Sequence, residues 1–181
     1  MDVAIIGNGA IGFGIGIQLL LADKNLKITI FGSAERTGSA SLAAAAMFNS
    51  YCEIEADTLE NEFDKRKWLM NREANSLWKD YIDLLSQSYN GELNYGFGTY
   101  LINNTISTNV EDDNYLAILK ALDFYNEPFD EINPSEIPGY FPKPNKRSNR
   151  GVYIPNEGWI NPTNLLTASE LLFQKLGGTI K

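Results

Sequence analysis

Histidine is absent from the 181-residue sequence, and cysteine occurs once, at Cys52. Without histidine, the chain can form neither a Ser-His-Asp triad nor a His-ligated metal site of its own. A single cysteine excludes an internal disulfide and a thiolate-rich zinc site, and it is typical of a reducing compartment. We therefore expect no metal site and a cytoplasmic location.

Positive charge is also scarce: 15 Lys and Arg residues stand against 23 Asp and Glu residues, for a net charge of -8. The largest basic cluster comprises only residues 65–67, which argues against a nucleic-acid partner. Residues 3–22 carry no charge, but five glycines, Asn8 and Gln18 interrupt them and Asp2 precedes them. We therefore expect no targeting peptide and no membrane segment.

What the chain does contain is a glycine-rich turn near its beginning. The apolar residues 3–6 predict a buried parallel strand, and the pattern G-x-G-x-x-G follows at residues 7–12. In a dinucleotide-binding turn, Gly7 permits the tight turn, Gly9 lets a pyrophosphate approach the backbone, and Gly12 lets the helix pack on the strand. The other residues of the predicted binding turn are Asn8, Ala10 and Ile11. The alternative is a tight strand–helix turn that binds no ligand.

Two further elements complete a β-α-β unit. Residues 11–23 predict a helix in which Ile11, Ile15 and Leu19 share one face, and residues 27–31 predict a second strand. The start of such a helix presents N–H groups and a partial positive charge to phosphates. This context favours dinucleotide binding over a turn without a ligand.

The end of the second predicted strand lacks the acidic residue that commonly receives the ribose hydroxyls. Gly32 occupies that position, Ser33 offers a weaker, uncharged partner, and Glu35 lies close by. Arg36 would suit the 2′-phosphate of NADP. The cofactor is therefore left open at this point, and a solvated loop is the alternative for these residues.

Two later motifs bring out a family resemblance. Small residues fill positions 38–47, where Ser39 or Ser41 would cap a helix, and residues 157–162 read Glu-Gly-Trp-Ile-Asn-Pro. Together with the glycine turn, they resemble the N-terminal half of the D-amino-acid oxidase and glycine oxidase family of FAD-dependent oxidoreductases. Two positions depart from the family pattern: Ala46 stands where the family usually has Gly, and Gly32 where it usually has a carboxylate.

The resemblance implies that FAD is the cofactor and that the flavin takes a hydride from the carbon next to an amine. It places Gly7, Gly9 and Gly12 at the FAD pyrophosphate and Ser33 at the ribose. The residues that it implies near the pyrophosphate and the flavin are Ser41, Ala45, Ala46 and Met47. The family's substrate-gripping arginine lies in the C-terminal half, so no catalytic residue is named in this chain.

The rest of the chain predicts an insertion followed by a second crossover helix. The expected elements are helices at residues 60–88, 110–125 and 162–176, the last capped by Asn161, and strands at 93–103, 151–154 and from Thr179 onward. We therefore predict an α/β fold whose Rossmann-like dinucleotide-binding domain comprises residues 1–50 and 150–181. Residues 51–149 would be an inserted α+β portion of a substrate domain.

The predicted domain is incomplete at its C-terminus. In a sheet of order 3-2-1-4, no residues remain for strand four, and strand one exposes an apolar edge. A second chain or a missing C-terminal half would complete the fold.

These observations favour the FAD-binding portion of a flavin-dependent amine or amino-acid oxidase or dehydrogenase, acting on a small amine or amino acid. An NAD(P)-dependent dehydrogenase fragment is one alternative, although the long insertion argues against it. A non-catalytic, degenerate flavoprotein subunit is the other, and Gly32 is its main support. The sequence identifies neither the substrate nor the catalytic residues.

Overall fold

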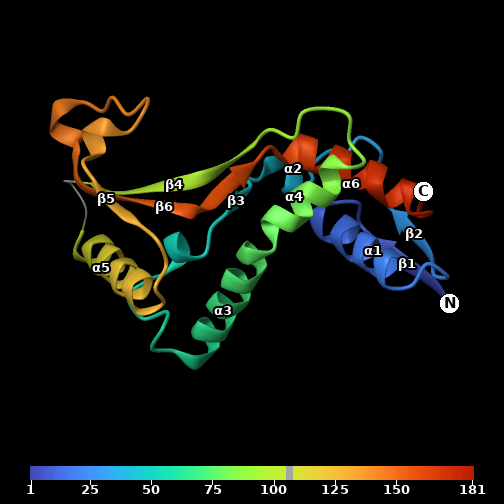
Figure 1. Cartoon of the computed structure of the whole chain (residues 1–181), viewed down its shortest axis with the longest axis horizontal. Helices are drawn as coiled ribbons and strands as arrows, with labels where there is room; N and C mark the ends of the chain where they lie inside the picture. Colours follow the sequence, from blue (N-terminus) through green and yellow to red (C-terminus); the bar gives the residue numbers. More distant parts are fainter. Residues whose placement is uncertain (105–107) are drawn as a thin grey trace. The chain divides into compact units, whose positions relative to one another are not determined.

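The computed structural model describes residues 1–104 and 108–181 (Figure 1). Two compact units are present. The first comprises Met1–Met47, Trp78–Tyr95 and Trp159–Lys181, and the second comprises Phe48–Leu77 and Gly96–Gly158. Each unit is therefore assembled from segments that are far apart in the sequence.

The first unit contains a three-stranded parallel sheet of order β1-β2-β7. Its strands are β1 (Asp2–Ile6), β2 (Lys27–Phe31) and β7 (Thr179–Ile180). Val3 lies opposite Ile28, and Ile30 lies opposite Ile180. The predicted β-α-β unit is confirmed, as is the return of the chain to this sheet after the second crossover helix.

Helices α1 (Ala10–Ala22) and α6 (Pro162–Lys175) pack against each other in this unit. The rings of Phe13 and Phe173 meet edge to face, with 6.0 Å between their centroids. A Cβ at Gly16 would lie 2.8 Å from the ring of Phe173 and 3.3 Å from Ile30. Glycine at this position therefore lets α1 approach α6 and β2 closely.

Helix α6 begins as predicted. The Asn161 side chain accepts hydrogen bonds from the N–H groups of Thr163 and Asn164 at 3.0 and 3.1 Å. Pro162 occupies the first turn of the helix. Because N–H groups in this turn have no acceptor within the helix, a proline here costs no helical hydrogen bond. Helix α4 (Trp78–Ser86) lies beside α6, and the hydroxyl oxygens of Tyr81 and Ser169 are 3.3 Å apart.

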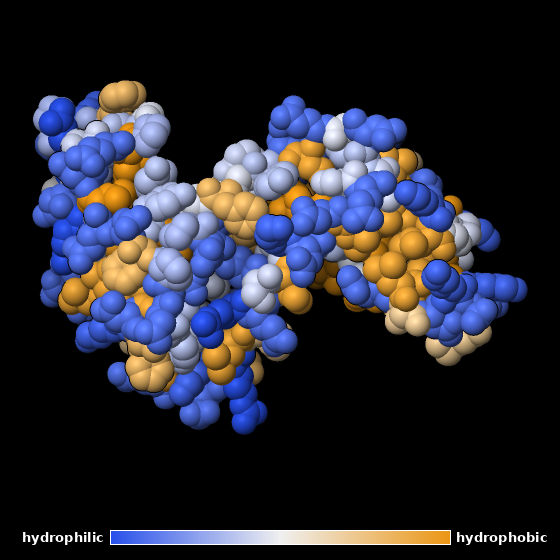
Figure 2. Space-filling view, in the orientation of Figure 1, coloured by the Kyte–Doolittle hydropathy of each residue, from blue (hydrophilic) through white to orange (hydrophobic). Residues whose placement is uncertain are grey.

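The structure corrects the predicted burial of β1 and α1. No residue of β1 is buried, and Ile6 is 84% exposed, since β1 has a strand neighbour on only one side within the described residues. In α1, Ile11 and Ile15 of the predicted face are exposed, and Figure 2 shows apolar side chains gathered over this helix. The buried residues of α1 are Gly12, Phe13, Gly16, Ile17 and Leu20.

The second unit is built around a sheet of order β3-β6-β4, with β5 antiparallel to β6. The strands are β3 (Met47–Phe48), β4 (Tyr95–Asn104), β5 (Asp130–Ile132) and β6 (Ser148–Ile160). β6 is much longer than the strand predicted at 151–154, because Pro155, Asn156 and Gly158 interrupt its sequence pattern without ending the strand. β3 and β5 lie outside the sequence prediction.

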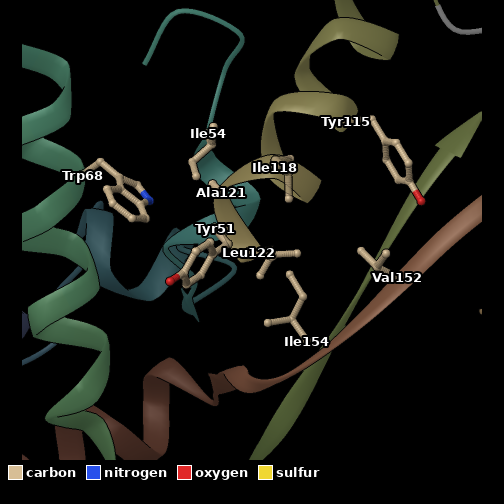
Figure 3. Close-up of a cluster of buried hydrophobic side chains, with 9 residues drawn as sticks. All are labelled: Tyr51, Ile54, Trp68, Tyr115, Ile118, Ala121, Leu122, Val152 and Ile154. Carbon is tan, nitrogen blue, oxygen red and sulfur yellow. The ribbon is translucent and has the colours of Figure 1, made fainter. Parts of the chain in front are cut away.

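Helices α3 (Glu62–Ser76) and α5 (Asn109–Phe124) and the 3₁₀-helix η1 (Tyr51–Glu53) contribute to the core of this unit. The core cluster, shown in Figure 3, comprises Tyr51, Ile54, Trp68, Tyr115, Ile118, Ala121, Leu122, Val152 and Ile154. The remaining short helices are α2 (Ala40–Ala43), η2 (Pro134–Glu136) and η3 (Pro144–Lys146).

The single helix predicted over residues 60–88 is in fact two helices. α3 ends at its C-cap, Leu77, whose N–H bonds to the carbonyl of Ala74 at 3.2 Å, and α4 begins at the next residue. The apolar pattern continues across the break because each helix buries a face of its own, with Trp68 in α3 and Ile82 and Leu85 in α4. The break coincides with the passage of the chain from the second unit to the first. Among the helices of the described residues, none has the length and apolar character needed to cross a membrane.

Candidate dinucleotide-binding site

The glycine turn joins the end of β1 to the start of α1. Gly7 has a φ of +108°, a conformation that favours glycine, and its N–H donates to the carbonyl of Phe31 at 2.7 Å. A Cβ at Gly12 would collide with the carbonyl oxygen of Gly7. Glycine is thus required at position 7 by the backbone conformation, and at position 12 because there is no room for a side chain. Both requirements agree with the predicted turn.

At the start of α1, Gly9 lies against Ser41 of the small-residue segment, residues 38–47. It is the N-cap residue of α1 and has no side chain with which to cap the helix. The Oγ of Ser41 accepts a hydrogen bond from the N–H of Ala10 at 3.0 Å, and a Cβ at Gly9 would lie 2.9 Å from that oxygen. The structure therefore brings Gly9, Ala10 and Ser41 together, although 31 residues separate Ala10 from Ser41.

Asn8 connects the turn to the end of β2. Its side chain is buried, at 8% exposure, and its Nδ2 donates to the carbonyl of Ser33 at 2.8 Å. Ser33 is therefore connected to the turn through its backbone carbonyl. A Cβ at Gly32 would lie 2.5 Å from the Oδ1 of Asn8. The position expected to carry a ribose-binding carboxylate is thus covered by the side chain of Asn8.

Arg36 contacts other residues of the protein, whereas the sequence suggested that it would suit the 2′-phosphate of NADP. Its Nε donates to the carbonyl of Asn8 at 3.2 Å, its guanidinium forms an ion pair with Glu170 of α6, and it lies 5.3 Å from the centroid of the Phe13 ring. The Arg36 side chain is only 13% exposed. Because the guanidinium is already committed to these partners, the structure removes the basis for placing it on an NADP 2′-phosphate. Sequence reasoning missed this role, and Glu170 carries no local signal for it.

The remaining predicted residues lie on the stretch that leads from α2 into β3. Ala45 and Met47 are exposed, whereas Ala46 is half-buried and has a φ of +52°. The carbonyl of Ala46 accepts a hydrogen bond from the N–H of Ile160 at 3.0 Å. Within the described ranges, the hydrogen bonds that tie the turn to Ser33 and Ser41 do not extend to these three residues. The positive φ explains why glycine would suit position 46.

The first residue of the later motif, Glu157, has a buried structural role. Glu157 is fully buried, and its Oε1 accepts hydrogen bonds from the N–H groups of Ser50 at 2.6 Å and Tyr51 at 2.5 Å. It therefore caps the start of η1. Burial and the neighbouring Glu157 carboxylate raise the pKa of the Cys52 thiol well above its ordinary value. Cys52 is thus a protonated thiol at neutral pH rather than a thiolate nucleophile.

The sequence model of the FAD dependent oxidoreductase family, abbreviated DAO, matches residues 2–181. The chain belongs to this family. FAD is therefore its cofactor, as predicted, and the match supports neither the NAD(P)-dependent alternative nor the degenerate subunit. A search of the curated proteins gave no match.

Solved structures of flavoprotein enzymes share the fold. Glycine oxidase from Geobacillus kaustophilus aligns with a TM-score of 0.76 and 21% identity, over 99% of this chain and 46% of that chain. Iminodiacetate oxidase (IdaA) from Chelativorans sp. BNC1 gives 0.74 and 18%, over 100% and 46%. L-α-glycerophosphate oxidase from Mycoplasma pneumoniae, solved with FAD bound, gives 0.63 and 18%, over 99% and 44%. The chain thus spans less than half the length of these structures.

Proposed function

We propose that this chain is the FAD-binding portion of a flavin-dependent oxidase or dehydrogenase that oxidises the C–N bond of a small amine or amino acid. The observation that carries the proposal is the glycine turn at the start of α1, with Ser41 hydrogen-bonded to its first N–H. The family match and the similar oxidase folds support it.

The described residues fit a dinucleotide at this turn. Gly9 leaves the backbone without a side chain, Gly7 and Gly12 allow the tight turn and the close packing that put it there, and the start of α1 contributes N–H groups and a partial positive charge. Ser41 lies at the same helix end and would share the pyrophosphate with these N–H groups. Ser33 would face the ribose, and the stretch from Ala45 to Met47 would lie near the flavin. These residues bind and orient the cofactor, and the flavin supplies the two-electron chemistry.

The division of labour between the two units forms part of the proposal. The first unit contains the glycine turn and would bind FAD, and the second would contribute to the substrate domain. The amine class rests on the names of the similar glycine and iminodiacetate oxidases. A cytoplasmic location is supported by the presence of a single cysteine, Cys52, which leaves the chain without an internal disulfide that would need an oxidising compartment.

A further polypeptide segment is also proposed, as a C-terminal half or a second chain. β1 has an open edge within the described residues, Ile6 and Ile11 are 84% and 78% exposed, and the similar structures are more than twice as long. A strand added to β1 would satisfy its backbone groups and cover this surface. The residues that grip the substrate would then come from that segment.

Titration of cofactor-free protein with FAD tests the assignment of the turn. Gly9→Val places a branched side chain where the pyrophosphate would lie and against Ser41, so we expect FAD to bind at least about 100-fold more weakly. Gly14→Ala is the control in the same helix, because a Cβ there meets no atom within 4 Å. Wild-type affinity in a folded Gly9→Val variant would rule out this site.

A further inference from the structure

The outer face of helix α3, in the second unit, carries a line of exposed apolar side chains. Phe63, Met70 and the C-cap residue Leu77 are 76%, 70% and 57% exposed. They follow one another at intervals of seven residues, which is close to two helical turns, so they form one line along the helix. Trp68, by contrast, is 2% exposed and belongs to the core cluster of Figure 3. The burial of Trp68 therefore fixes which face of α3 is presented outward.

Charged residues of opposite sign stand on one edge of this line, on either side of Met70. Arg66 comes four residues before Met70 and Glu73 three residues after it, and both are exposed. Neither has an ion-pair partner among the described residues. They are about 10.5 Å apart along the helix axis, too far to pair with each other. The other edge of the line contains Lys67 and the small Ala74.

This arrangement makes the outer face of α3 complementary to itself. In an antiparallel pair of α3 helices with a two-fold axis at Met70, a residue before Met70 lies beside the residue that follows Met70 by the same interval in the second copy. Phe63 of one copy then meets Leu77 of the other, and Met70 meets its own counterpart. Arg66 lies within about 1.5 Å, one residue's rise, of the height of Glu73 of the second copy, on the same edge. The pair therefore contains two equivalent contacts between opposite charges.

We infer that the outer face of α3 binds a second copy of this chain, as an antiparallel helix pair centred on Met70. Burial of the apolar line of both copies drives the association. The charges set the direction, because a parallel pair would place Arg66 beside Arg66 and Glu73 beside Glu73. On the other edge, Lys67 lies beside Ala74 of the second copy, so this edge brings no like charges together. The inference does not depend on the redox function proposed above.

Sedimentation equilibrium of the complete protein tests the association. All variants carry Ile6→Lys, which places a charge on β1 and separates this contact from association through the open edge of that strand. We expect a monomer–dimer equilibrium with a Kd on the order of 10 µM, as suits a small interface. Phe63→Glu should raise this Kd at least about tenfold. Phe141→Glu, the same substitution at a 93% exposed side chain outside α3, is the matched control and should leave the Kd unchanged.

Charge reversal shows whether the contact joins two copies of the same face. Arg66→Glu or Glu73→Arg alone brings like charges together across the two-fold axis and should raise the Kd at least about fivefold. The double variant restores opposite charges and should return the Kd to within about twofold of its original value. Because the two side chains are too far apart to meet within one helix, this rescue requires a contact between copies.

Single cysteines test the antiparallel direction, in a protein that also carries Cys52→Ala. Met70→Cys lies on the two-fold axis, within disulfide reach of its counterpart, so copper phenanthroline should oxidise the two thiols to a linked dimer. Leu77→Cys lies about 10.5 Å from the axis and therefore about 21 Å from its counterpart, so it should not cross-link. In a parallel pair, both positions would cross-link.

Three results would overturn the inference. The first is a monomer at concentrations up to about 100 µM, which is also the result expected if another segment of the same protein covers α3. The second is a dimer that Phe63→Glu leaves intact, since the contact would then lie elsewhere. The third is a double charge reversal that dimerises no better than the single variants.

Discussion

The side chain of Asn8 occupies the space into which any side chain at position 32 would have to grow. A Cβ at Gly32 would lie 2.5 Å from the Oδ1 of Asn8 and 2.9 Å from its Cβ. Asn8 is held there by its hydrogen bond to the carbonyl of Ser33. The missing carboxylate at the end of β2 and the asparagine in the glycine turn are therefore one coupled feature.

Gly32→Ala is accordingly expected to destabilise the protein, because the new methyl group displaces Asn8 and breaks its bond to Ser33. The free energy of unfolding should fall by about 1–3 kcal/mol. Asn8→Ala removes the obstacle, so Gly32→Ala should cost much less in that background. Urea unfolding of the two single variants and the double variant measures the coupling, and additive effects would contradict the proposed contact.

The backbone conformation of Ala46 is unfavourable for alanine, and a glycine at this position would adopt it more easily. Its φ of +52° lies in the left-handed region, which L-residues adopt at a cost of about 1 kcal/mol or more and which achiral glycine adopts without that cost. Ala46→Gly is therefore expected to raise the free energy of unfolding by up to about 1 kcal/mol.

The neighbouring substitution Ala45→Gly provides the matched control for Ala46→Gly. Ala45 has no positive φ, so glycine there gains only chain entropy in the unfolded state and should lower stability by about 0.5–1 kcal/mol. Thermal unfolding of the two variants should shift the midpoint in opposite directions. A common direction would argue against the backbone conformation at position 46.

Local signals predicted part of the fold well. β2 begins and ends where the alternating sequence indicates, and Asn161 followed by a proline marks the start of α6. The buried face of α1 could not be predicted, because the helix contains no charged residue to mark its exposed side. The division between α3 and α4 was hidden for the opposite reason, since both helices continue one apolar pattern.

In the candidate site, too, local requirements could be predicted from the sequence and long-range contacts could not. The spacing of Gly7, Gly9 and Gly12 predicts the turn because these requirements are local. The contacts of Arg36 cannot be inferred this way, since its partner Glu170 lies 134 residues further along the chain. The bond from Asn8 to Ser33 spans 25 residues and depends on the register of β1 and β2. Such pairings follow from tertiary structure and leave no pattern in the sequence.

Cys52 should react slowly with thiol reagents in the folded protein. Burial and the Glu157 carboxylate raise its pKa, so we expect little reaction with a disulfide reagent at pH 8 and rapid reaction once the protein is unfolded. Glu157→Gln removes the contribution of the Glu157 carboxylate and should speed the reaction of the folded protein. Equal rates for folded and unfolded wild type would show that the thiol is not perturbed.

The same pKa shift predicts a pH dependence of stability. A thiol whose folded pKa lies above its unfolded value of about 8.5 binds more protons in the folded state, so its stabilising contribution is complete below pH 8.5 and declines above it. Burial also raises the pKa of Tyr51, to about 12, which adds a decline only above about pH 10. Unfolding measured from pH 8 to 10 should therefore show a fall in stability that Cys52→Ala lacks.

The open edge of β1 should make the chain prone to self-association when no further segment covers it. Ile6 is 84% exposed on a strand with a neighbour on one side only, and unpaired strand edges with apolar side chains recruit other strands. Light scattering should therefore give the isolated chain an average mass above that of a monomer. Ile6→Lys places a charge on this strand and should lower that mass. Phe141→Lys is the matched control, because Phe141 is 93% exposed and lies in the second unit. A larger effect of Phe141→Lys, or a strictly monomeric wild type, would exclude β1 as the surface that awaits a partner strand.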